Sequence, residues 1–424
     1  MSTFLDYEIF QSGFKAKHST ESALLYVTNE LRKSAAEPGK VSILILLDLS
    51  AAFDTLDHSI LINRLRSFIG LSGSALNWFI SYLSNRSFQV KQNSDTSTRY
   101  FFKHGVPQGS VLGPILYRIY VLPLLVLLSS LGLSFHCYAD DTQIYITCTS
   151  ASFPRQLQYM QNVYNIISNW LSDNFLKLND SKSEVILIGT PHYVSLCKNT
   201  ATSINLGNTN IAFSSTVKNL GVLIDESLTF VPHIKNCRKT SFFKLKNLRH
   251  IRNYFNRSSF ESIINALITS KLDYCNSLFI NLPASYITLL QSIQNYAARL
   301  ILRRGLYSSV QPLLFHLHWL PVKDRITFKI LLITYKIIHL SEPNYLVSQL
   351  KLKTPARTLR NQDNLTLETP WFKNSARMGD CSFFIAAPKL WNSLPLSIRS
   401  APSVESFKSL LKKHLFSNRY QSYL

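Results

Sequence analysis

Two apolar, strand-forming segments of the chain carry aspartates where a strand is expected to end or turn. The segment VSILILLDLS (41–50) is a continuous run of Val, Ile and Leu up to Asp48, the pattern of a strand covered on both faces. The segment SFHCYADDTQIYITC (134–148) indicates a strand, a tight turn at Asp140 and Asp141, and a second strand. Because neighbouring carboxylates raise the cost of ionising each other, a packed sheet that holds them needs a partner that neutralises them.

Divalent cations are the partner that best explains these acids. Mg²⁺ takes oxygen ligands, usually one or two carboxylates together with substrate phosphates. A pair of ions about 3.5–4 Å apart can hold the attacking and leaving oxygens of a phosphoryl transfer. An isolated Asp-Asp pair is more often a solvated turn, and the loop HGVPQGSVLGP (104–114) taken alone is a plain loop. Together with Asp48, however, they favour a metal site beside a backbone that a flat partner can approach closely.

The segments around these acids predict an α+β fold in which helices pack on the sheet that carries the aspartates. Expected helices cover 58–69, 74–86 and 155–176, a hairpin turns at 93–96, a helix follows the 104–114 loop, and short strands lie in 182–189 and 215–225. Amphipathic segments from residue 233 onward predict helices. The predicted domains are therefore 1–232, a helical basic domain at 233–340, and a C-terminal region at 341–424 with a linker (351–370) and a last helix (403–416).

The positive charge of the chain is concentrated in its C-terminal part. The whole sequence has 45 Lys and Arg against 24 Asp and Glu, a net charge of +21. Counted along the printed sequence, residues 1–232 hold 17 basic and 16 acidic side chains, which leaves 28 and 8 for residues 233–424. Such an excess favours a polyanionic partner, most commonly nucleic acid, over the alternative of a merely solubilising surface.

Cysteines and apolar segments indicate an intracellular protein, in the nucleus or the cytoplasm. The six cysteines form no CxxC pair and have no zinc-ligand spacing, so we expect reduced thiols. No signal peptide is visible at the N-terminus. The uncharged segment 119–138 is long enough to cross a bilayer. Since Pro123 interrupts it and it runs into Asp140, a buried helix followed by a buried strand is favoured, and no membrane is expected.

Three motifs together resemble a known family. LLDLSAAFDTLDH, GVPQGSVLGPILY and YADDTQIY, in this order, are similar to the palm motifs of reverse transcriptases, specifically those of non-LTR (LINE-type, jockey-like) retrotransposons. The resemblance extends upstream to QSGFKAKHSTESAL and downstream to LKLNDSKSEVILIG and VKNLGVLIDESLTFVPHI, and later segments also resemble the C-terminal regions of these elements. It implies the palm of a right-hand polymerase with partial fingers, followed by a mainly helical, basic thumb and C-terminal region.

The resemblance also implies roles for individual residues. Asp48, Asp140 and Asp141 would be the catalytic metal-binding triad, with two Mg²⁺ ions, or Mn²⁺ as the alternative, as cofactors. Phe53 would stack under the incoming sugar, although core packing competes as its role. Lys182 would lie near the triphosphate or simply be exposed. The remaining positions are Leu49, Pro107, Gln108 and Gly109 for nucleotide and template binding, and Leu220, Gly221 and Val222 for the primer grip.

The function implied is RNA-directed DNA polymerisation, a nucleotidyl transfer that extends a primer 3′-hydroxyl. The partners implied are an RNA template, a DNA primer and dNTPs. The chain begins almost at QSGF, so we expect an N-terminally truncated copy without the endonuclease domain and with incomplete fingers. The priming nick would then have to come from elsewhere. YRIYVLPLL also departs from the Asn-Asp-Leu that these elements often carry there.

Two other functions are compatible with the residues. The first is a catalytically inactive, decayed or co-opted remnant that still binds nucleic acid; the intact triad argues against long decay. The second is a metal-dependent nuclease, which is disfavoured because the Gln-Gly segment would have no role there.

Overall fold

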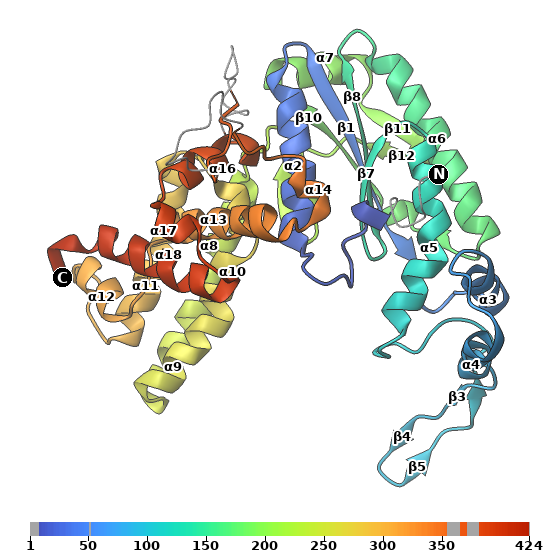
Figure 1. Cartoon of the computed structure of the whole chain (residues 1–424), viewed down its shortest axis with the longest axis horizontal. Helices are drawn as coiled ribbons and strands as arrows, with labels where there is room; N and C mark the ends of the chain where they lie inside the picture. Colours follow the sequence, from blue (N-terminus) through green and yellow to red (C-terminus); the bar gives the residue numbers. More distant parts are fainter. Residues whose placement is uncertain (1–7, 51, 354–364, 371–380, 424) are drawn as a thin grey trace. The chain divides into compact units, whose positions relative to one another are not determined.

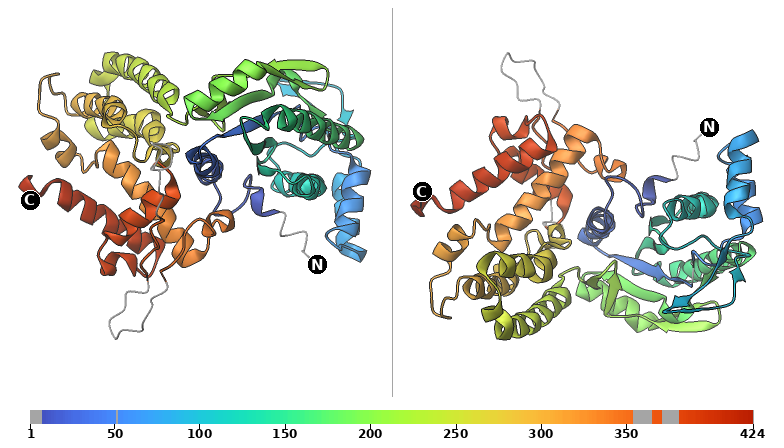
Figure 2. Two further views of the ribbon diagram at one scale, coloured as in Figure 1. Left: turned by 90° about the horizontal axis from the view of Figure 1, so that it is seen from above. Right: turned by 90° about the horizontal axis from the view of Figure 1, so that it is seen from below.

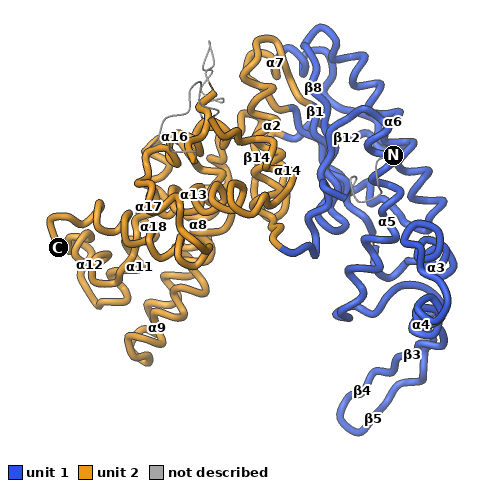
Figure 3. The backbone as a smooth tube through the Cα atoms, viewed as in Figure 1, with its two compact units in different colours: residues 1–16, 43–187, 195–214 blue, residues 17–42, 188–194, 215–424 orange. Residues whose placement is uncertain are grey.

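The computed structural model describes residues 8–50, 52–353, 365–370 and 381–423. The chain forms two compact units, each assembled from segments that are separated in the sequence (Figure 3). Unit 1 consists of Met1–Ala16, Ile43–Leu187 and Ser195–Ser214, and unit 2 of Lys17–Ser42, Ile188–Val194 and Ser215–Leu424. The domain boundaries expected after residues 232 and 340 stay a prediction.

A four-stranded sheet with the order β10-β1-β8-β7 forms the centre of unit 1 (Figure 1). Its strands are β1 (Lys40–Leu47), β7 (Ser134–Tyr138), β8 (Asp141–Thr149) and β10 (Glu184–Gly189). Nearly every residue of β1 and β10 is buried, as their continuous apolar runs predict. β7 and β8 pair antiparallel from Ser134 opposite Tyr145 to Tyr138 opposite Asp141, which confirms the predicted hairpin.

Two long helices pack against β7 and β8, the two strands of the hairpin. Helix α5 (Gly113–Ser130) contacts β7, α6 (Phe153–Asp173) contacts β8, and the two helices contact each other (Figure 2). Within the part of the chain that the structure describes, α5 is the one helix long and apolar enough to cross a membrane, and half of that stretch is buried inside the protein. The predicted order of a helix followed by a buried strand is confirmed.

A helical pair follows the strand that ends near Asp48. Helices α3 (His58–Ser67) and α4 (Gly73–Leu83) contact each other, and α3 packs on α5. Asp57 begins α3 as its N-cap, since its side chain accepts a hydrogen bond from the Ile60 amide at 2.9 Å. The expected helices at 58–69 and 74–86 are thus confirmed.

The shorter elements of the first 225 residues complete the connections. They are η1 (Glu8–Phe10), β2 (Leu49–Ser50) paired with β9 (Lys177–Leu178), β3 (Ser87–Phe88) paired with β6 (Tyr100–Phe101), β4 (Lys91–Gln92) paired with β5 (Asp95–Thr96), η2 (Asp180–Lys182), α7 (Pro191–Thr200), β11 (Ser203–Leu206) paired with β12 (Thr209–Ala212), and β13 (Thr216–Asn219) paired with β14 (Val222–Asp225). The predicted 87–101 hairpin is confirmed, whereas α7, β11 and β12 were not predicted.

Beyond β13 and β14, unit 2 is almost entirely helical, as predicted from residue 233 onward. Its further elements are α2 (Thr20–Ala36), α8 (Val231–Ile251), η3 (Arg252–Tyr254), α9 (Arg257–Ile264), the π-helical turn η4 (Asn265–Thr269), α10 (Ser270–Asp273), η5 (Asn276–Phe279), α11 (Ala284–Ile301), α12 (Gln311–His316), α13 (Val322–Leu340), α14 (Asn344–Val347), α16 (Phe383–Asn392), α17 (Leu396–Arg399), α18 (Val404–Arg419) and η6 (Gln421–Tyr423). Helix α8 packs along α11, and α13 packs on α16 and α18. The predicted last helix is α18, and most of the expected 351–370 linker lies outside the described residues.

Helix α2 brings a buried arginine into unit 2. Its N-terminus has a capping box formed by Ser19 and Ser22. The Arg32 side chain is only 1% exposed and donates hydrogen bonds to the carbonyl oxygens of Cys381, Leu228 and Leu278, at 2.5, 3.2 and 3.4 Å. One guanidinium therefore joins three segments that are distant in the sequence.

All six cysteines are buried, and the structure forms no disulfide among them; their reduced state stays a prediction. Burial raises the pKa of the Cys137 thiol to about 12, so this side chain behaves as a small apolar group at neutral pH.

We expect Asp57→Ala to destabilise unit 1 by about 1 kcal/mol, because it removes the side-chain acceptor at the N-terminus of α3. Urea unfolding followed by circular dichroism measures the change. Asp95→Ala is the control, since Asp95 is exposed in the β4–β5 hairpin. Equal unfolding midpoints for the two variants would contradict the capping role.

Candidate functional site

Asp48 lies at the end of β1, between two pairings that fix the backbone. Its carbonyl oxygen accepts a hydrogen bond from the Asn179 amide at 2.9 Å. Leu49, the next residue, is 7% exposed and pairs with Leu178. Leu49 is therefore a buried strand residue in unit 1, and the carboxylate of Asp48 is held at the edge of the apolar core.

The β7–β8 turn carries the other two acids. Because Tyr138 pairs with Asp141, the turn consists of Ala139 and Asp140 alone. Ala139 adopts a φ of 57°, in the left-handed region that costs an L-residue energy. β8 is the direct neighbour of β1 in the sheet. The strands thus supply all three aspartates to one site.

The three carboxylates interact electrostatically. Burial raises the pKa of Asp140, and the Asp48 carboxylate adds to this effect. Burial, Asp140 and Asp48 together raise the pKa of Asp141 to about 6. Both shifts have the sign expected for like charges gathered at a partly desolvated site.

A lysine side chain approaches these acids. Lys182 is the last residue of η2, and its Nζ lies 3.6 Å from Asp48 Oδ2. The first residue of η2, Asp180, accepts a hydrogen bond from the Tyr164 hydroxyl. The Lys182 side chain is 69% exposed. The Lys182 side chain is therefore exposed and lies beside Asp48, and its role near a triphosphate stays a prediction.

The donor set fits a hard divalent cation with other ligands to complete its shell. Carboxylate oxygens are the ligands that Mg²⁺ takes, and it is usually bound by one or two of them plus phosphate oxygens. Among the residues that the structure describes, no group of three or more His, Cys, Asp and Glu side chains is arranged to hold an ion by itself. Asp48, Asp140 and Asp141 thus stay candidate ligands, which would need water or phosphate oxygens to complete a coordination shell.

An aromatic stack follows Asp48 in the sequence. The Phe53 ring is half-buried and stacks on Tyr117, with 4.5 Å between ring centroids, and Phe14 meets Phe53 edge-on at 6.0 Å. Tyr117 is 1% exposed, and its pKa is raised well above the usual value by burial and by Asp140. The sequence analysis did not identify Tyr117; its place on α5, just after the Gly/Pro loop, was the available signal.

The loop with Pro107, Gln108 and Gly109 docks on the segment after Asp48. Ser110 N donates to Pro107 O at 3.1 Å, and Gly109 has a φ of 80°, as the third position of a type II turn requires. The Gln108 side chain donates to the Asp54 carboxylate at 3.3 Å. The turn thus presents Gln108 on the outside of the loop.

Three hydrogen bonds join the loop to the segment that follows Asp48. Gly105 N donates to Leu56 O at 2.7 Å, Val106 N donates to Phe53 O at 3.0 Å, and His58 Nε2 contacts Gly105 O at 2.8 Å. A Cβ at Gly105 would lie 2.7 Å from Asp54 O, so a larger residue does not fit. The predicted loop residues and Phe53 therefore belong to one packed substructure.

The predicted primer-grip residues form the turn of the β13–β14 hairpin in unit 2. Leu220 and Gly221 both have positive φ, 43° and 82°, the backbone of a tight two-residue hairpin turn, and Val222 begins β14. The Tyr274 hydroxyl donates to Leu220 O at 2.7 Å. The turn is therefore fixed by a side chain that the sequence analysis did not select.

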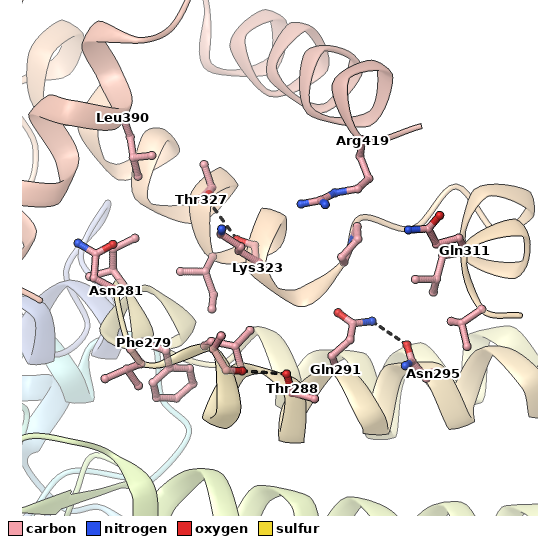
Figure 4. Close-up of a pocket in the computed structure, with 18 of the residues that line it drawn as sticks. Phe279, Asn281, Thr288, Gln291, Asn295, Gln311, Lys323, Thr327, Leu390 and Arg419 are labelled. Carbon is pink, nitrogen blue, oxygen red and sulfur yellow. Dashed lines mark hydrogen bonds between the residues drawn. The ribbon is translucent and has the colours of Figure 1, made fainter. Parts of the chain in front are cut away.

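Unit 2 also contains a hollow that is separate from these groups. It has a volume of about 560 Å³ and is lined mainly by residues of α11, α12 and the start of α13 (Figure 4). Its amides and hydroxyls bond within the protein: Gln291 donates to Asn295 and accepts from the Val322 amide, and Thr288 donates to Ala284 O. No Asp or Glu is among the described residues that line it.

The sequence model of one protein family, "Reverse transcriptase (RNA-dependent DNA polymerase)", matches residues 3–224. This range contains Asp48, Asp140 and Asp141. The chain belongs to the reverse transcriptase family. The predicted α+β polymerase fold and the recognised family are thereby confirmed.

Curated relatives of this reverse transcriptase come from insect retrotransposons. It is 28% identical over 298 residues to the probable RNA-directed DNA polymerase from transposon X-element of Drosophila melanogaster, with 69% of this chain and 31% of the relative covered. It is 26% identical over 278 residues to the RNA-directed DNA polymerase from mobile element jockey of Drosophila funebris, with 64% and 29% covered. The chain spans less than a third of the length of these relatives.

Among solved structures, two telomerases are similar. One is telomerase from Candida albicans in complex with the TWJ fragment of telomeric RNA, at 15% identity and a TM-score of 0.36, with 76% of this chain and 53% of that chain covered. The other is apo telomerase from Candida tropicalis, at 14% identity and a TM-score of 0.36, with 81% and 58% covered. At these scores the family match, and not these structures, decides the fold.

Asp141→Asn should stabilise the metal-free protein at neutral pH. The pKa of Asp141 is raised from 3.8 in the unfolded chain to about 6 in the folded protein. Between these two pH values the folded protein holds a proton that the unfolded chain has lost. Stability therefore falls as pH rises between those values and stays lower above them. We expect the variant to melt above wild type at about pH 8 with chelator and to match it at about pH 3.

Differential scanning fluorimetry across this pH range measures the effect, with Asp95→Asn as the charge-matched control. Mg²⁺ should raise the melting temperature of wild type more than that of Asp141→Asn. A variant whose melting temperature follows pH as wild type does would contradict the electrostatic account.

Proposed function

We propose that this chain carries the polymerase centre of an RNA-directed DNA polymerase of a non-LTR retrotransposon, which extends a primer 3′-hydroxyl on an RNA template. The observation that carries the proposal is the shared electrostatic site of Asp48, Asp140 and Asp141 on neighbouring strands of a reverse transcriptase family member. The printed names of its curated relatives support the same activity.

Asp48 and Asp140, with Asp141 as the weaker ligand, would hold divalent cations, which when bound would lower the pKa of the primer 3′-hydroxyl and balance charge on the departing pyrophosphate. The charges of the three carboxylates make the site attractive to cations before substrate arrives. Lys182 has a flexible, exposed stem and a cation beside Asp48, so it can reach the triphosphate of an incoming dNTP and donate a proton or a hydrogen bond there.

Aromatic and amide groups beside the acids position the nucleotide. Phe53 is held from behind by Tyr117, so its half-exposed ring offers a rigid surface against which a deoxyribose packs. The buried Leu49 side chain supports the backbone next to Asp48 from the apolar core. Pro107 and Gly109 fix the turn that carries Gln108. When nucleotide and template bind, the Gln108 side chain gives up its hydrogen bond to Asp54 and contacts them instead.

The basic helices of unit 2 bind template and primer through phosphates. A hollow of about 590 Å³ is lined by four side chains of α8, Lys235, Arg238, Lys239 and Phe242, and by Leu289 of α11. Phosphate contacts from such side chains fix position and carry no sequence information. The Leu220–Val222 turn, held by Tyr274, acts as the primer grip. The buried cysteines, which form no disulfide in the structure, support an intracellular location.

Primer extension tests the proposal directly. With an RNA template, a DNA primer, dNTPs and Mg²⁺, wild type should extend the primer, and Asp140→Asn should lower the rate roughly 100-fold or more, since loss of a metal ligand costs at least as much as loss of its outer supports. Asp95→Asn, which removes the same charge from an exposed hairpin, should extend like wild type.

Equal extension by wild type and Asp140→Asn would refute a catalytic role for this aspartate. If neither protein extends the primer while both bind template–primer with a steep salt dependence, the alternative of a non-catalytic, nucleic-acid-binding remnant holds instead.

Arg238→Gln should weaken binding to template–primer duplexes equally for all sequences, because the contact is electrostatic. The slope of log Kd against log salt should fall by about 0.9, the change expected for one lost phosphate contact. Fluorescence anisotropy at several salt concentrations measures this slope. Arg155→Gln, an exposed position on α6, is the matched control, and an unchanged slope in Arg238→Gln would contradict the assignment of α8.

A further inference from the structure

The segment Gln11–Gly13 of unit 1 lies against the turn that carries Asp140, although more than a hundred residues separate them in sequence. Gln11 forms a parallel bridge with Cys137, and Ser12 N donates to Cys137 O at 2.9 Å. The segment therefore acts as a short additional strand beside the end of β7. None of the roles discussed above uses it.

The Gln11 side chain binds both backbone groups of Ala139. Its Oε1 accepts from Ala139 N at 2.9 Å, and its Nε2 donates to Ala139 O at 3.2 Å. The same Oε1 accepts from Gly13 N at 2.8 Å. The side chain is 1% exposed, so these bonds are made away from water, where an unmade bond would be costly. The Gln11 side-chain amide thus pairs with the N–H and C=O groups of Ala139 as a neighbouring strand would.

Ala139 needs such support because of its backbone conformation. A φ of 57° is accessible to glycine without cost, but in alanine the Cβ crowds the backbone. A single residue in this region persists only when surrounding contacts hold it. The paired hydrogen bonds from Gln11 are contacts of this kind, and they act on the residue directly before the two aspartates.

Two neighbouring features make the contact specific. A Cβ on Gly13 would lie 2.2 Å from Ala139 N, so only glycine permits the close approach. Ser12 Oγ lies 2.9 Å from Nε2 of His136, a residue that is fully buried on β7. Backbone, side chain and close packing therefore all join residues 11–13 to this hairpin.

We propose that Gln11 is a positioning residue that fixes the Ala139 backbone and thereby the directions in which Asp140 and Asp141 present their carboxylates. The inference rests on the proposed polymerase function for its catalytic consequence, while the positioning itself is a property of the fold. Glutamine suits the role because it has one donor and one acceptor to match the peptide groups of Ala139; glutamate would lose the donor, and asparagine is one methylene shorter.

Hydrogen–deuterium exchange at the Ala139 amide tests the positioning without any need for activity. In Gln11→Ala this amide should exchange at least tenfold faster than in wild type, while the amide of Ile144 in β8 should stay within twofold. Gln92→Ala, on the exposed β4 strand, should match wild type at both amides. An unchanged rate at Ala139, or faster exchange throughout β7 and β8, overturns the proposal.

Steady-state primer extension tests the consequence. Gln11→Ala should lower kcat at least tenfold with the KM for dNTP within threefold of wild type, because the acids are misdirected while the nucleotide surface around Phe53 is intact. Equal kcat in the presence of the exchange effect overturns the catalytic part. If wild type itself does not extend primers, the proposed function fails, and the exchange result alone still decides the positioning role.

Discussion

Repulsion among three carboxylates is the constraint on which the rest of unit 1 depends. Burial, together with the neighbouring carboxylates, raises the pKa of Asp140 and Asp141, so both acids cost more to ionise here than in water. Such an arrangement persists only if the surrounding structure leaves the acids no freedom to separate. The buried strands β1 and β10, and the helices α5 and α6 that pack on the hairpin, supply that rigidity through apolar contact.

The elements that could be predicted from sequence are those with a strong local pattern. The apolar run before Asp48 gave β1, alternation around the Asp-Asp pair gave the β7–β8 hairpin, and amphipathic spacing gave α6 and α8. Residues 191–212 hold α7 and a small hairpin that were not predicted, because strands of four residues such as β11 and β12 are too short for their alternation to stand out in the sequence. An element can therefore be predicted when it is long enough for its apolar residues to recur at a regular spacing.

The site could be predicted in composition but not in its supports. The aspartates, Phe53 and Gln108 stand in motifs that resemble a family, so their roles could be proposed from sequence alone. The contacts that hold them were not visible: Tyr117 lies under Phe53, and Gln11 is bonded to a residue 128 positions away. Pairings of this range leave no local signal in a single sequence, so they appear only once the chain is folded.

Arg32 has a consequence for how the protein is made. The guanidinium is fully buried in the finished fold, yet its carbonyl partner at Cys381 lies 349 residues later in the chain. At translation rates of about 5–20 residues per second, that partner leaves the ribosome roughly 20–70 s after the arginine. During this interval the guanidinium can reach the carbonyl oxygens of Leu228 and Leu278 once they have been made, but its third partner is missing. The full set of buried hydrogen bonds of α2 is therefore complete only after the C-terminal segment that contains Cys381 has been made.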